Sequence, residues 1–340
     1  MNVRSSSRPE VPIFRIGLGL SFNCVSGLIL LCAICFAAFP ARCPGQTLKA
    51  AGVPQKVIID TDIGDDIDDA FAVALALRSP ELQILGITTT FGDTETRARL
   101  LDRFLGEAGR QDIVVAAGTP TQTPNHLTQR RYAEGGRFAK PSHVSAVDYT
   151  LSQIQKYPNQ ITLIAIGPLM NVGALIDRDN EAFRRLKRVV LMGGSIERGY
   201  SHSVYEPPPE PQPEWNILND IPSAQKLFAS GVPIYVMPLD STQLKLDEVK
   251  RSFLFHQGTP ITDSLTLLYH QWGQESPTLF DPMAVSFAVD STLCPVQPMR
   301  IRVDEKGFTR VEAGPSNANV CLHSDPETFF RFYLSRVAAR

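Results

Sequence analysis

Six aspartates fall within ten residues directly after a short apolar run, and no other segment limits the possible folds of this chain as strongly. The apolar residues Val57–Ile59 read as a buried strand, and the Ala-rich run Ala70–Leu77 reads as a helix. The aspartates therefore occupy a strand-to-helix loop at the carboxyl edge of a sheet, where open α/β folds bind their ligands. The six are Asp60, Asp62, Asp65, Asp66, Asp68 and Asp69.

Carboxylates packed this closely repel one another, so a fold that gathers them needs a cation or raised pKa values. Oxygen ligands in this number suit Ca²⁺ or Mg²⁺. An EF-hand loop is excluded, because counting from the first aspartate places Asp65 where Gly is required and Phe71 where Glu is required. Helix capping is the alternative reading, and it accounts for Asp68 and Asp69 but not for the aspartates at the strand end.

Apolar runs alternate with helical patterns along the rest of the chain, which is typical of parallel βαβ units. The strand-like runs are continuously apolar, so helices should cover both faces of the sheet. The sequence predicts an α/β fold with an open, mostly parallel, Rossmann-like sheet flanked by helices. Expected strands are Val57–Asp60, Ile84–Thr88, Ile113–Ala116, Ile161–Ile166, Val189–Met192 and Ile234–Met237. Expected helices are Asp68–Leu77, Glu95–Ala108, Val147–Lys156, Met170–Ile176, Ile221–Ala229, Ser264–Trp272 and Pro282–Val289.

The last part of the chain changes character. Met299–Val303 and Phe308–Val311 predict a small C-terminal β-hairpin, and Pro326–Val337 predicts a closing helix. No repeat or linker marks a second domain, so residues 46–340 are expected to form a single domain.

Residues 1–45 are typical of a targeting segment. Arg4, Arg8 and Arg15 precede an apolar stretch from Ile16 to Phe39 that contains no charged residue. Polar residues and glycines dilute this stretch, which favours a cleaved signal peptide and an exported protein, periplasmic or secreted. Its length also allows an uncleaved anchor over residues 16–39, the one membrane attachment that the sequence suggests.

The formal net charge is −2, and no basic stripe indicates nucleic-acid binding. Four of the six cysteines lie in or beside the N-terminal segment, which leaves Cys294 and Cys321 in the body. These two either pair in an oxidising compartment or remain buried free thiols.

Two long connections, Gly118–Ser145 and Gly193–Pro213, stand out between the expected elements. Loops of this length in a compact domain are usually functional lids or disordered. The proline-rich run Glu206–Pro213 predicts a stiff polyproline II segment at the edge of a lid, or alternatively a docking motif for a partner.

The segment Asp60–Ala70 resembles the opening motif of the inosine-uridine-preferring nucleoside hydrolases, Asp-x-Asp-Pro-Gly-x-Asp-Asp-Ala. Ile63 replaces the proline, and two extra residues separate Gly64 from the Asp-Asp-Ala triplet. The resemblance runs from about Lys56 to Ala288. It implies hydrolysis of the N-glycosidic bond of a neutral ribonucleoside, with Ca²⁺ as cofactor. Further segments match in order: Ile87–Asp93, Ile164–Asn171, Val189–Gly194, Glu214–Asn216 and Phe280–Ala284.

The resemblance implies that one aspartate of the Asp-Asp pair deprotonates the attacking water and that the other binds the metal. Matching the Asp-Asp-Ala triplet makes Asp68 the base and Asp69 the ligand. Counting from Gly64 instead makes Asp66 the base, but Ile67 would then occupy the ligand position. Asp68 is therefore preferred, and Asp66 stays a competitor.

The remaining metal ligands implied by the resemblance are Asp62, the backbone carbonyl of Ile166 and Asp281. Asp60 is expected to orient the loop by accepting backbone hydrogen bonds. The residues expected to contact the ribose are Asp93, Glu214 and Asn216, with Met192 beneath the sugar.

The group that protonates the leaving base is not apparent. Many members of the resembled family place a His before the late Asp, where this chain has Phe280, and Glu134–Gly135 replaces a His-Gly segment. The residues that could substitute are His126, Tyr132, His143, His202 and Tyr205.

Two other functions compete with nucleoside hydrolysis. An exported nucleoside or sugar binder could keep the same pocket with weak or lost catalysis. A Mg²⁺-dependent phosphatase also opens with Asp-x-Asp after an apolar strand, but it needs Thr or Val where this chain has Gly64. The resembled family also allows a homo-oligomer, although no surface pattern in the sequence indicates one.

Overall fold

The structure is a computed structural model, and it describes residues 53–135, 137–201, 207 and 209–339. The expected leader over residues 1–45, with its apolar stretch 16–39, lies outside these residues. Within the described part of the chain, no helix is both long enough and apolar enough to cross a membrane.

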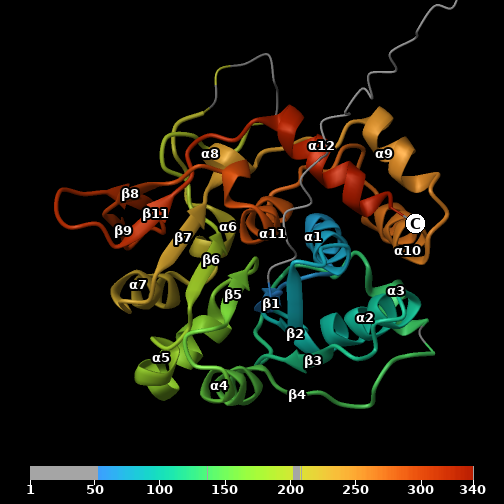
Figure 1. The fold of residues 1–340 in the computed structure, drawn as a ribbon, viewed down its shortest axis with the longest axis horizontal. Helices are drawn as coiled ribbons and strands as arrows, with labels where there is room; N and C mark the ends of the chain where they lie inside the picture. Colours follow the sequence, from blue (N-terminus) through green and yellow to red (C-terminus); the bar gives the residue numbers. More distant parts are fainter. Residues whose placement is uncertain (1–52, 136, 202–206, 208, 340) are drawn as a thin grey trace, which may run out of the picture. The chain divides into compact units, whose positions relative to one another are not determined.

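A nine-stranded sheet with the order β4-β3-β2-β1-β5-β6-β7-β11-β8 forms the centre of the body, and only β8 runs antiparallel to its neighbour (Figure 1). The chain moves outward from β1 to one edge of the sheet through β2, β3 and β4, and it returns to the other side of β1 with β5. The strand order therefore reverses between β1 and β5, and a crevice is expected at the carboxyl ends of these two strands. The strands are β1 Gln55–Thr61, β2 Leu82–Thr89, β3 Val114–Ala117, β4 Val144–Ser145, β5 Thr162–Ala165, β6 Arg188–Met192, β7 Ile234–Met237, β8 Gln297–Met299 and β11 Ala318–Val320.

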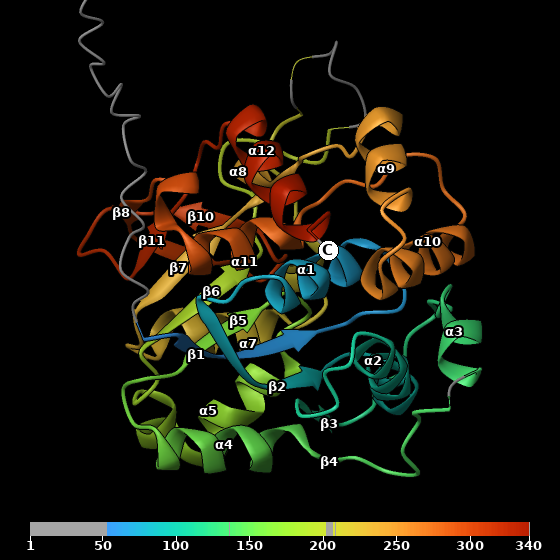
Figure 2. The same ribbon diagram turned by 45° about the vertical axis from the view of Figure 1, so that its right-hand side comes forward.

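Helices cover both faces of the sheet, as Figure 2 shows. Alternate residues of the central strand face opposite ways: Val57 and Ile59 join one core cluster, and Ile58 joins the other. The first cluster includes residues of α1 Asp68–Leu77, α2 Thr94–Glu107, α10 Pro260–Trp272, α11 Asp281–Val289 and α12 Pro326–Val337. The second includes residues of α4 Ala146–Lys156, α5 Met170–Phe183 and α7 Ile221–Ala229.

The predicted α/β class, the six predicted strands, the C-terminal hairpin and the closing helix are confirmed. The hairpin consists of β9 Ile301–Val303 and β10 Thr309–Val311. Sequence patterns missed the three-residue strands β8 and β11, which, unlike β9 and β10, are not joined to each other by a short turn that marks a hairpin. They also missed the short helices α3 Arg130–Glu134, α6 Trp215–Leu218 and α8 Leu239–Thr242, as well as α9 Glu248–Phe255.

The connection Gly118–Ser145 is not structureless, since it contains α3 and β4. In the second long connection, the described part of the proline-rich run is tied to the preceding segment. Gly199 N donates to Pro209 O at 2.8 Å, and Gln212 N donates to Ser195 Oγ at 3.0 Å. Of the two alternatives for the cysteines, the structure shows the pair: Cys294 and Cys321 form a disulfide.

Candidate active site

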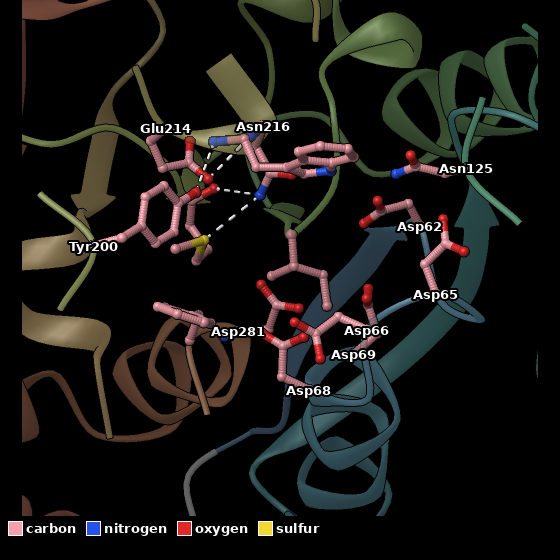
Figure 3. A pocket seen from close by; sticks show the side chains of 14 residues that line it. Asp62, Asp65, Asp66, Asp68, Asp69, Asn125, Tyr200, Glu214, Asn216 and Asp281 are labelled. Atoms are coloured by element: carbon pink, nitrogen blue, oxygen red, sulfur yellow. Dashed lines mark hydrogen bonds between the residues drawn. The ribbon is translucent and has the colours of Figure 1, made fainter. Parts of the chain in front are cut away.

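A cavity of about 340 Å³ lies at the carboxyl ends of β1 and β5 (Figure 3). Residues from both halves of the chain line it, so the fold brings the N-terminal carboxylate loop against the segments that follow β6 and precede α11. The lining residues are Asp62, Asp65, Asp66, Asp68, Asp69, Asn125, Ile166, Met192, Tyr200, Glu214, Trp215, Asn216, Phe280 and Asp281.

Asp68, Asp69 and Asp281 form a carboxylate triad at the floor of the cavity. One oxygen from each lies within 4.8 Å of the others, and all three side chains are buried. Asp68 and Asp69 begin α1 and Asp281 begins α11, and these two helices pack together. The backbone N–H of Asp281 also donates to Asp68 Oδ2 at 3.3 Å.

Burial is the largest cause that raises the pKa of each triad aspartate well above its usual range, and repulsion from the neighbouring carboxylates raises it further. A donor set made only of buried, mutually repelling carboxylate oxygens fits a hard divalent cation, which would relieve both costs. The sequence prediction of Asp69 and Asp281 as ligands agrees with this placement. The triad also contains Asp68, which the sequence indicated as the base.

Asp62 and Ile166 line the same cavity from the ends of β1 and β5. Asp62 is 7% exposed and lies outside the triad. Burial raises the pKa of its carboxyl to about 6, and the positive charge of Arg97 opposes that shift. Ile166 follows β5 directly, and its N–H donates to Asp60 O at 2.8 Å, which fixes this strand end against β1.

Asp60 orients the loop through side-chain donors, so the expectation of backbone donors is wrong. The carboxylate of Asp60 is 1% exposed and accepts from Thr88 Oγ1 at 2.5 Å and from Asn171 Nδ2 at 2.7 Å. These bonds connect the ends of β1 and β2 to the start of α5. The backbone N–H groups of the neighbouring strands already donate within the sheet. The carboxylate at the end of β1 therefore accepts hydrogen bonds from side chains instead.

The side chain of Arg97 on α2 binds the carboxylate loop, and the sequence analysis did not identify this residue. Its side chain is 1% exposed, and it donates to the backbone oxygens of Phe91 at 2.8 Å, of Ile63 at 2.9 Å and of Asp62. It also forms a salt bridge of 3.0 Å with Asp65. The sequence carries no signal that singles it out, because α2 contains three arginines, Arg97, Arg99 and Arg103.

Glu214, Asn216 and Met192 form one hydrogen-bonded unit on the opposite wall. Glu214 caps α6: its oxygens accept from the N–H groups of Asn216 at 2.9 Å, Gly194 at 2.9 Å and Ile217 at 3.2 Å. Asn216 Nδ2 donates to Met192 O at 3.1 Å. Burial raises the pKa of Glu214 to about 7. All three residues predicted here from the sequence lie on the cavity.

Asp66 lines the cavity but is solvent-exposed, and its Oδ1 accepts from the N–H of Ile67 at 2.7 Å. Asp68 is 5% exposed and faces the triad. Of the two aspartates that compete for the role of base, Asp68 is therefore the one that is buried and belongs to the triad.

Asp93, which the sequence suggested for ribose binding, does not line the cavity. It caps α2 by accepting from Thr96 N at 3.1 Å, and it forms a salt bridge of 2.8 Å with Arg130. The motif places this residue at the first turn of a helix, where a carboxylate satisfies the free N–H groups instead of turning toward a ligand.

An aromatic wall of Tyr200, Trp215 and Phe280 completes the cavity. The Tyr200 and Phe280 rings meet edge to face with centroids 6.1 Å apart, and the Tyr200 hydroxyl accepts from Trp215 N at 2.9 Å. Phe91 packs against the back of Trp215 with centroids 5.9 Å apart. An aromatic wall beside a floor of carboxylates suits a ligand with an apolar ring at one end and polar groups at the other.

Five residues were candidates for protonating a leaving base, and those that the structure describes do not line the cavity. His126 is exposed on a loop, and the Tyr132 hydroxyl is buried against Ser264 at 2.9 Å. The ring of His143 lies between Glu95 and Asp102, at 2.8 and 2.9 Å. His202 and Tyr205 lie outside the described residues.

His143 instead fastens the long connection to α2, and this predicts a pH dependence of stability. Burial lowers the pKa of His143, but hydrogen bonds to Asp102 and Glu95 outweigh it, so the pKa is raised. A raised folded-state pKa adds stability below about 6.5, and this stability is lost as the pH rises through the folded-state value. We expect the free energy of unfolding to fall by about 1–2 kcal/mol over that window. Urea titrations at a series of pH values test this, and His143→Gln should remove the dependence.

Comparison with known proteins identifies relatives over most of the chain. Residues 57–331 match the family model described as inosine-uridine preferring nucleoside hydrolase. Uridine nucleosidase 1 of Arabidopsis thaliana is 28% identical, over 76% of this chain and 80% of the relative. The pyrimidine-specific ribonucleoside hydrolase RihA of Citrobacter koseri is also 28% identical, over 83% of this chain and 97% of the relative.

Solved structures agree with these sequence matches. A plant nucleoside hydrolase superposes with a TM-score of 0.71 at 27% identity, covering 84% of this chain and all of that one. A purine-preferring ribonucleoside hydrolase from Gardnerella vaginalis superposes with a TM-score of 0.72 over 84% of this chain and 98% of that one. At 24% identity, the second likeness shows the fold alone.

Proposed function

We propose that this chain, which belongs to the inosine-uridine preferring nucleoside hydrolase family, uses Ca²⁺ as its cofactor when it cleaves the N-glycosidic bond. Membership of this family makes the protein a ribonucleoside hydrolase. The observation that carries the proposal is the triad Asp68, Asp69 and Asp281 facing Glu214 and Asn216 across one cavity. The complete carboxylate set favours an enzyme over a binder, and the family match argues against the phosphatase alternative.

We propose that Asp69 and Asp281 hold the cation, together with Asp62 and the carbonyl oxygen of Ile166. Ca²⁺ accepts up to eight oxygen ligands, so one site can accommodate these four groups and the sugar hydroxyls. When bound, the cation lowers the pKa of a nearby water and so eases its deprotonation.

In this proposal, Asp68 removes the proton from the attacking water. The cleavage passes through a transition state that resembles an oxocarbenium ion, so the surrounding carboxylates stabilise the positive charge that develops on the sugar. Glu214 and Asn216 hold the ribose hydroxyls, since their side chains are fixed by the bonds at the start of α6. Asp62 is the alternative base, because it is buried beside the triad without belonging to it.

The charge of the cavity predicts that nucleotides are not substrates. Its lining contains seven carboxylates and, among the described residues, no Lys, Arg or His. A 5′-phosphate would therefore meet repulsion without a compensating hydrogen bond. We expect inosine and uridine 5′-monophosphates to be cleaved at least about 100-fold more slowly than the nucleosides, which is the effect of roughly 3 kcal/mol of lost transition-state binding.

The decisive experiment measures reducing-sugar release by the purified protein from inosine, uridine, adenosine and cytidine, with Ca²⁺ and with a chelator. Release that requires Ca²⁺ supports the proposal, and the relative rates show which nucleobases the enzyme prefers. Calcium binding without release from any nucleoside would favour the binder instead, and phosphate release from a monoester would favour the phosphatase.

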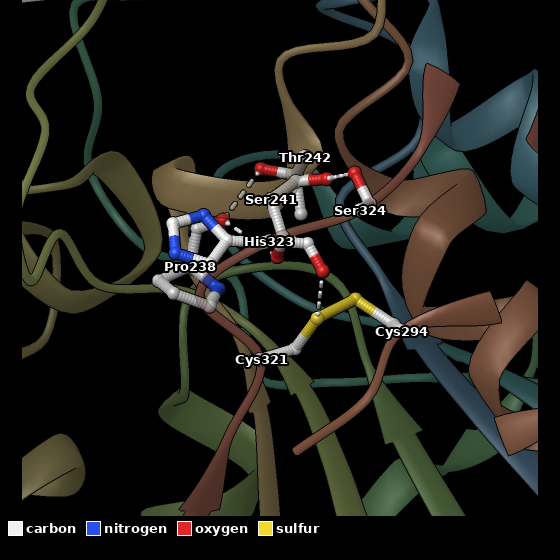
Figure 4. The surroundings of a disulfide bond; sticks show 7 residues. All are labelled: Pro238, Ser241, Thr242, Cys294, Cys321, His323 and Ser324. Atoms are coloured by element: carbon white, nitrogen blue, oxygen red, sulfur yellow. Dashed lines mark hydrogen bonds between the residues drawn. A yellow bond between two sulfur atoms is a disulfide. The ribbon is translucent and has the colours of Figure 1, made fainter. Parts of the chain in front are cut away.

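We also propose an oxidising, exported location, which the Cys294–Cys321 disulfide supports. Figure 4 shows this bond beside Ser241 and Ser324, whose hydroxyl donates to Ser241 O at 2.6 Å. The disulfide joins the segment that follows α11 to the end of β11. Helix α11 itself begins with Asp281.

Removing this disulfide should lower stability without changing the chemistry. Cys294→Ala with Cys321→Ala opens a loop with a sequence separation of 27 residues, for which the expected loss is about 3.5 kcal/mol. Urea unfolding of the oxidised protein and of the double variant measures the loss. A reductant should shift the unfolding midpoint of the parent protein only, and equal midpoints under oxidising conditions would contradict the prediction.

A further inference from the structure

The cavity carries more negative charge than a bound cation neutralises. The triad accounts for three of its seven carboxylates, and Asp65 forms a salt bridge with Arg97. Of the other three, Asp62 is a proposed ligand of the cation, so four carboxylates surround two positive charges, and Asp66 and Glu214 form no salt bridge within the described part of the chain. The two extra residues that separate this chain from the motif it resembles lie within Asp65–Ile67, so the insertion itself adds charge to the cavity wall.

The aromatic wall lies next to this charge. Trp215 lines the cavity together with Asp62 and is 39% exposed. The quadrupole of an indole attracts a cation to the ring face, and a carboxylate beside the ring strengthens that attraction. This end of the cavity therefore favours a flat, positively charged ring.

Outside the carboxylates, the described lining residues offer no acid suited to a neutral leaving base, and Glu214, whose pKa burial raises to about 7, is held by three N–H groups at the start of α6. Apart from carboxylates, the one lining side chain that could donate a proton from oxygen is Tyr200, and burial raises its pKa far above neutrality. Phe280 stands where the resembled family has a His. A neutral nucleobase leaves as an anion unless it is protonated, whereas a cationic base leaves as a neutral molecule.

We propose that the preferred substrates of this site are N-ribosides whose base carries a fixed positive charge, such as pyridinium ribosides and N7-alkylated purine ribosides; this inference rests on the proposed ribonucleoside hydrolysis. In the reaction, the bond between C1′ and the ring nitrogen breaks, and its electron pair neutralises the ring. The water oxygen bonds to C1′, and the water proton passes to the carboxylate base. The products are ribose, a neutral base and one proton, so no general acid is required.

The first test compares nicotinamide riboside with inosine and uridine as substrates of the calcium-loaded protein. We expect kcat/KM to be at least about tenfold higher for the pyridinium riboside. Because pyridinium ribosides are also intrinsically labile, the salt dependence provides a second readout. Raising the ionic strength from about 0.02 M to about 0.5 M should lower kcat/KM for nicotinamide riboside and leave that for inosine nearly constant.

A Phe280→His variant tests the missing acid. It should raise kcat/KM for inosine by about tenfold or more, since general acid catalysis typically contributes at least that much, and the ratio of nicotinamide riboside to inosine should fall accordingly. Trp215→Leu should lower the same ratio by removing the ring face, while the calcium affinity measured by titration calorimetry reports whether the site is still intact.

The outcomes separate this inference from the function beneath it. If inosine or uridine is hydrolysed at least as efficiently as nicotinamide riboside, with the same salt dependence, the inference is overturned and nucleoside hydrolysis stands. If no riboside is hydrolysed, the proposed function itself fails. A Phe280→His variant that folds, binds calcium and leaves the ratio unchanged also overturns the inference.

Discussion

Replacing Asp68 with Asn is expected to lower kcat for nucleoside hydrolysis by about 10³-fold, within the range that a general base contributes. The asparagine side chain keeps the size and one oxygen of the aspartate but cannot accept a proton. Asp68 is 5% exposed and faces Asp69 and Asp281, so no solvent-exposed carboxylate can take over its place in the triad. Initial rates of ribose release at saturating nucleoside measure the loss.

Calcium affinity decides what the loss means. If Asp68 acts as the base, Asp68→Asn should keep a dissociation constant for Ca²⁺ close to that of the parent protein, as measured by titration calorimetry. Asp69→Asn and Asp281→Asn should weaken Ca²⁺ binding strongly, because each removes a charged ligand. If Asp68→Asn abolishes Ca²⁺ binding as well, Asp68 is a ligand, and Asp62 becomes the base.

Two comparison variants rank the remaining carboxylates. Asp66→Asn should cost far less than Asp68→Asn, because Asp66 is exposed and bonds to the backbone of its own loop. Asp62→Asn separates the two roles left open for that residue: lost Ca²⁺ affinity marks a ligand, and lost kcat with intact affinity marks the base. A larger effect from Asp66→Asn than from Asp68→Asn would contradict the preferred register of the motif.

The parts of the site that the sequence predicted are those fixed by local pattern. An apolar strand followed by aspartates and an Ala-rich helix defines where Asp62, Asp68 and Asp69 lie, because a strand-to-helix loop leaves little freedom. Glu214 and Asp281 were found through motif resemblance, since nothing in their own segments indicates that they meet the carboxylate loop. Their meeting depends on the reversal of strand order between β1 and β5.

The parts that the sequence did not predict depend on contacts between distant segments. Asp93 fits the sugar-contacting motif, but its carboxylate is engaged by the first turn of α2 and by Arg130. Tyr200 reaches the cavity from a long connection whose path no periodic pattern specifies. Arg97 is the clearest case, because a buried arginine and an exposed one look alike in a sequence until the carbonyl groups that surround it are known.

Replacing Arg97 with Met is expected to lower the free energy of unfolding by about 3–5 kcal/mol, the cost of breaking a buried charged network by removing one partner. Met retains much of the apolar volume but leaves Asp65 without its salt bridge and the backbone oxygens of Ile63 and Phe91 without these donors. Urea unfolding of the variant in chelator measures this effect on the protein alone.

Arg99 provides the matched control on the same helix. It is only partly buried, and its Nη2 makes one side-chain hydrogen bond to Thr96 Oγ1 at 2.7 Å, so Arg99→Met should cost less than about 1 kcal/mol. Arg97→Lys keeps the charge, but an ammonium group cannot replace the planar fork that reaches several acceptors at once, so it should recover only part of the loss. Arg97→Met with Asp65→Asn should lose less than Arg97→Met alone, because the unpaired carboxylate is then removed as well.

The same network should connect stability to the metal site. Arg97 binds the backbone oxygen of Asp62 and of Ile63, so it fixes the loop from which Asp62 enters the cavity. Arg97→Met should therefore weaken Ca²⁺ binding at temperatures where the variant is still fully folded, whereas Arg99→Met should not. If Arg97→Met bound Ca²⁺ as tightly as the parent protein, the loop would be held by its other bonds, and Arg97 would serve the stability of the fold without positioning the site.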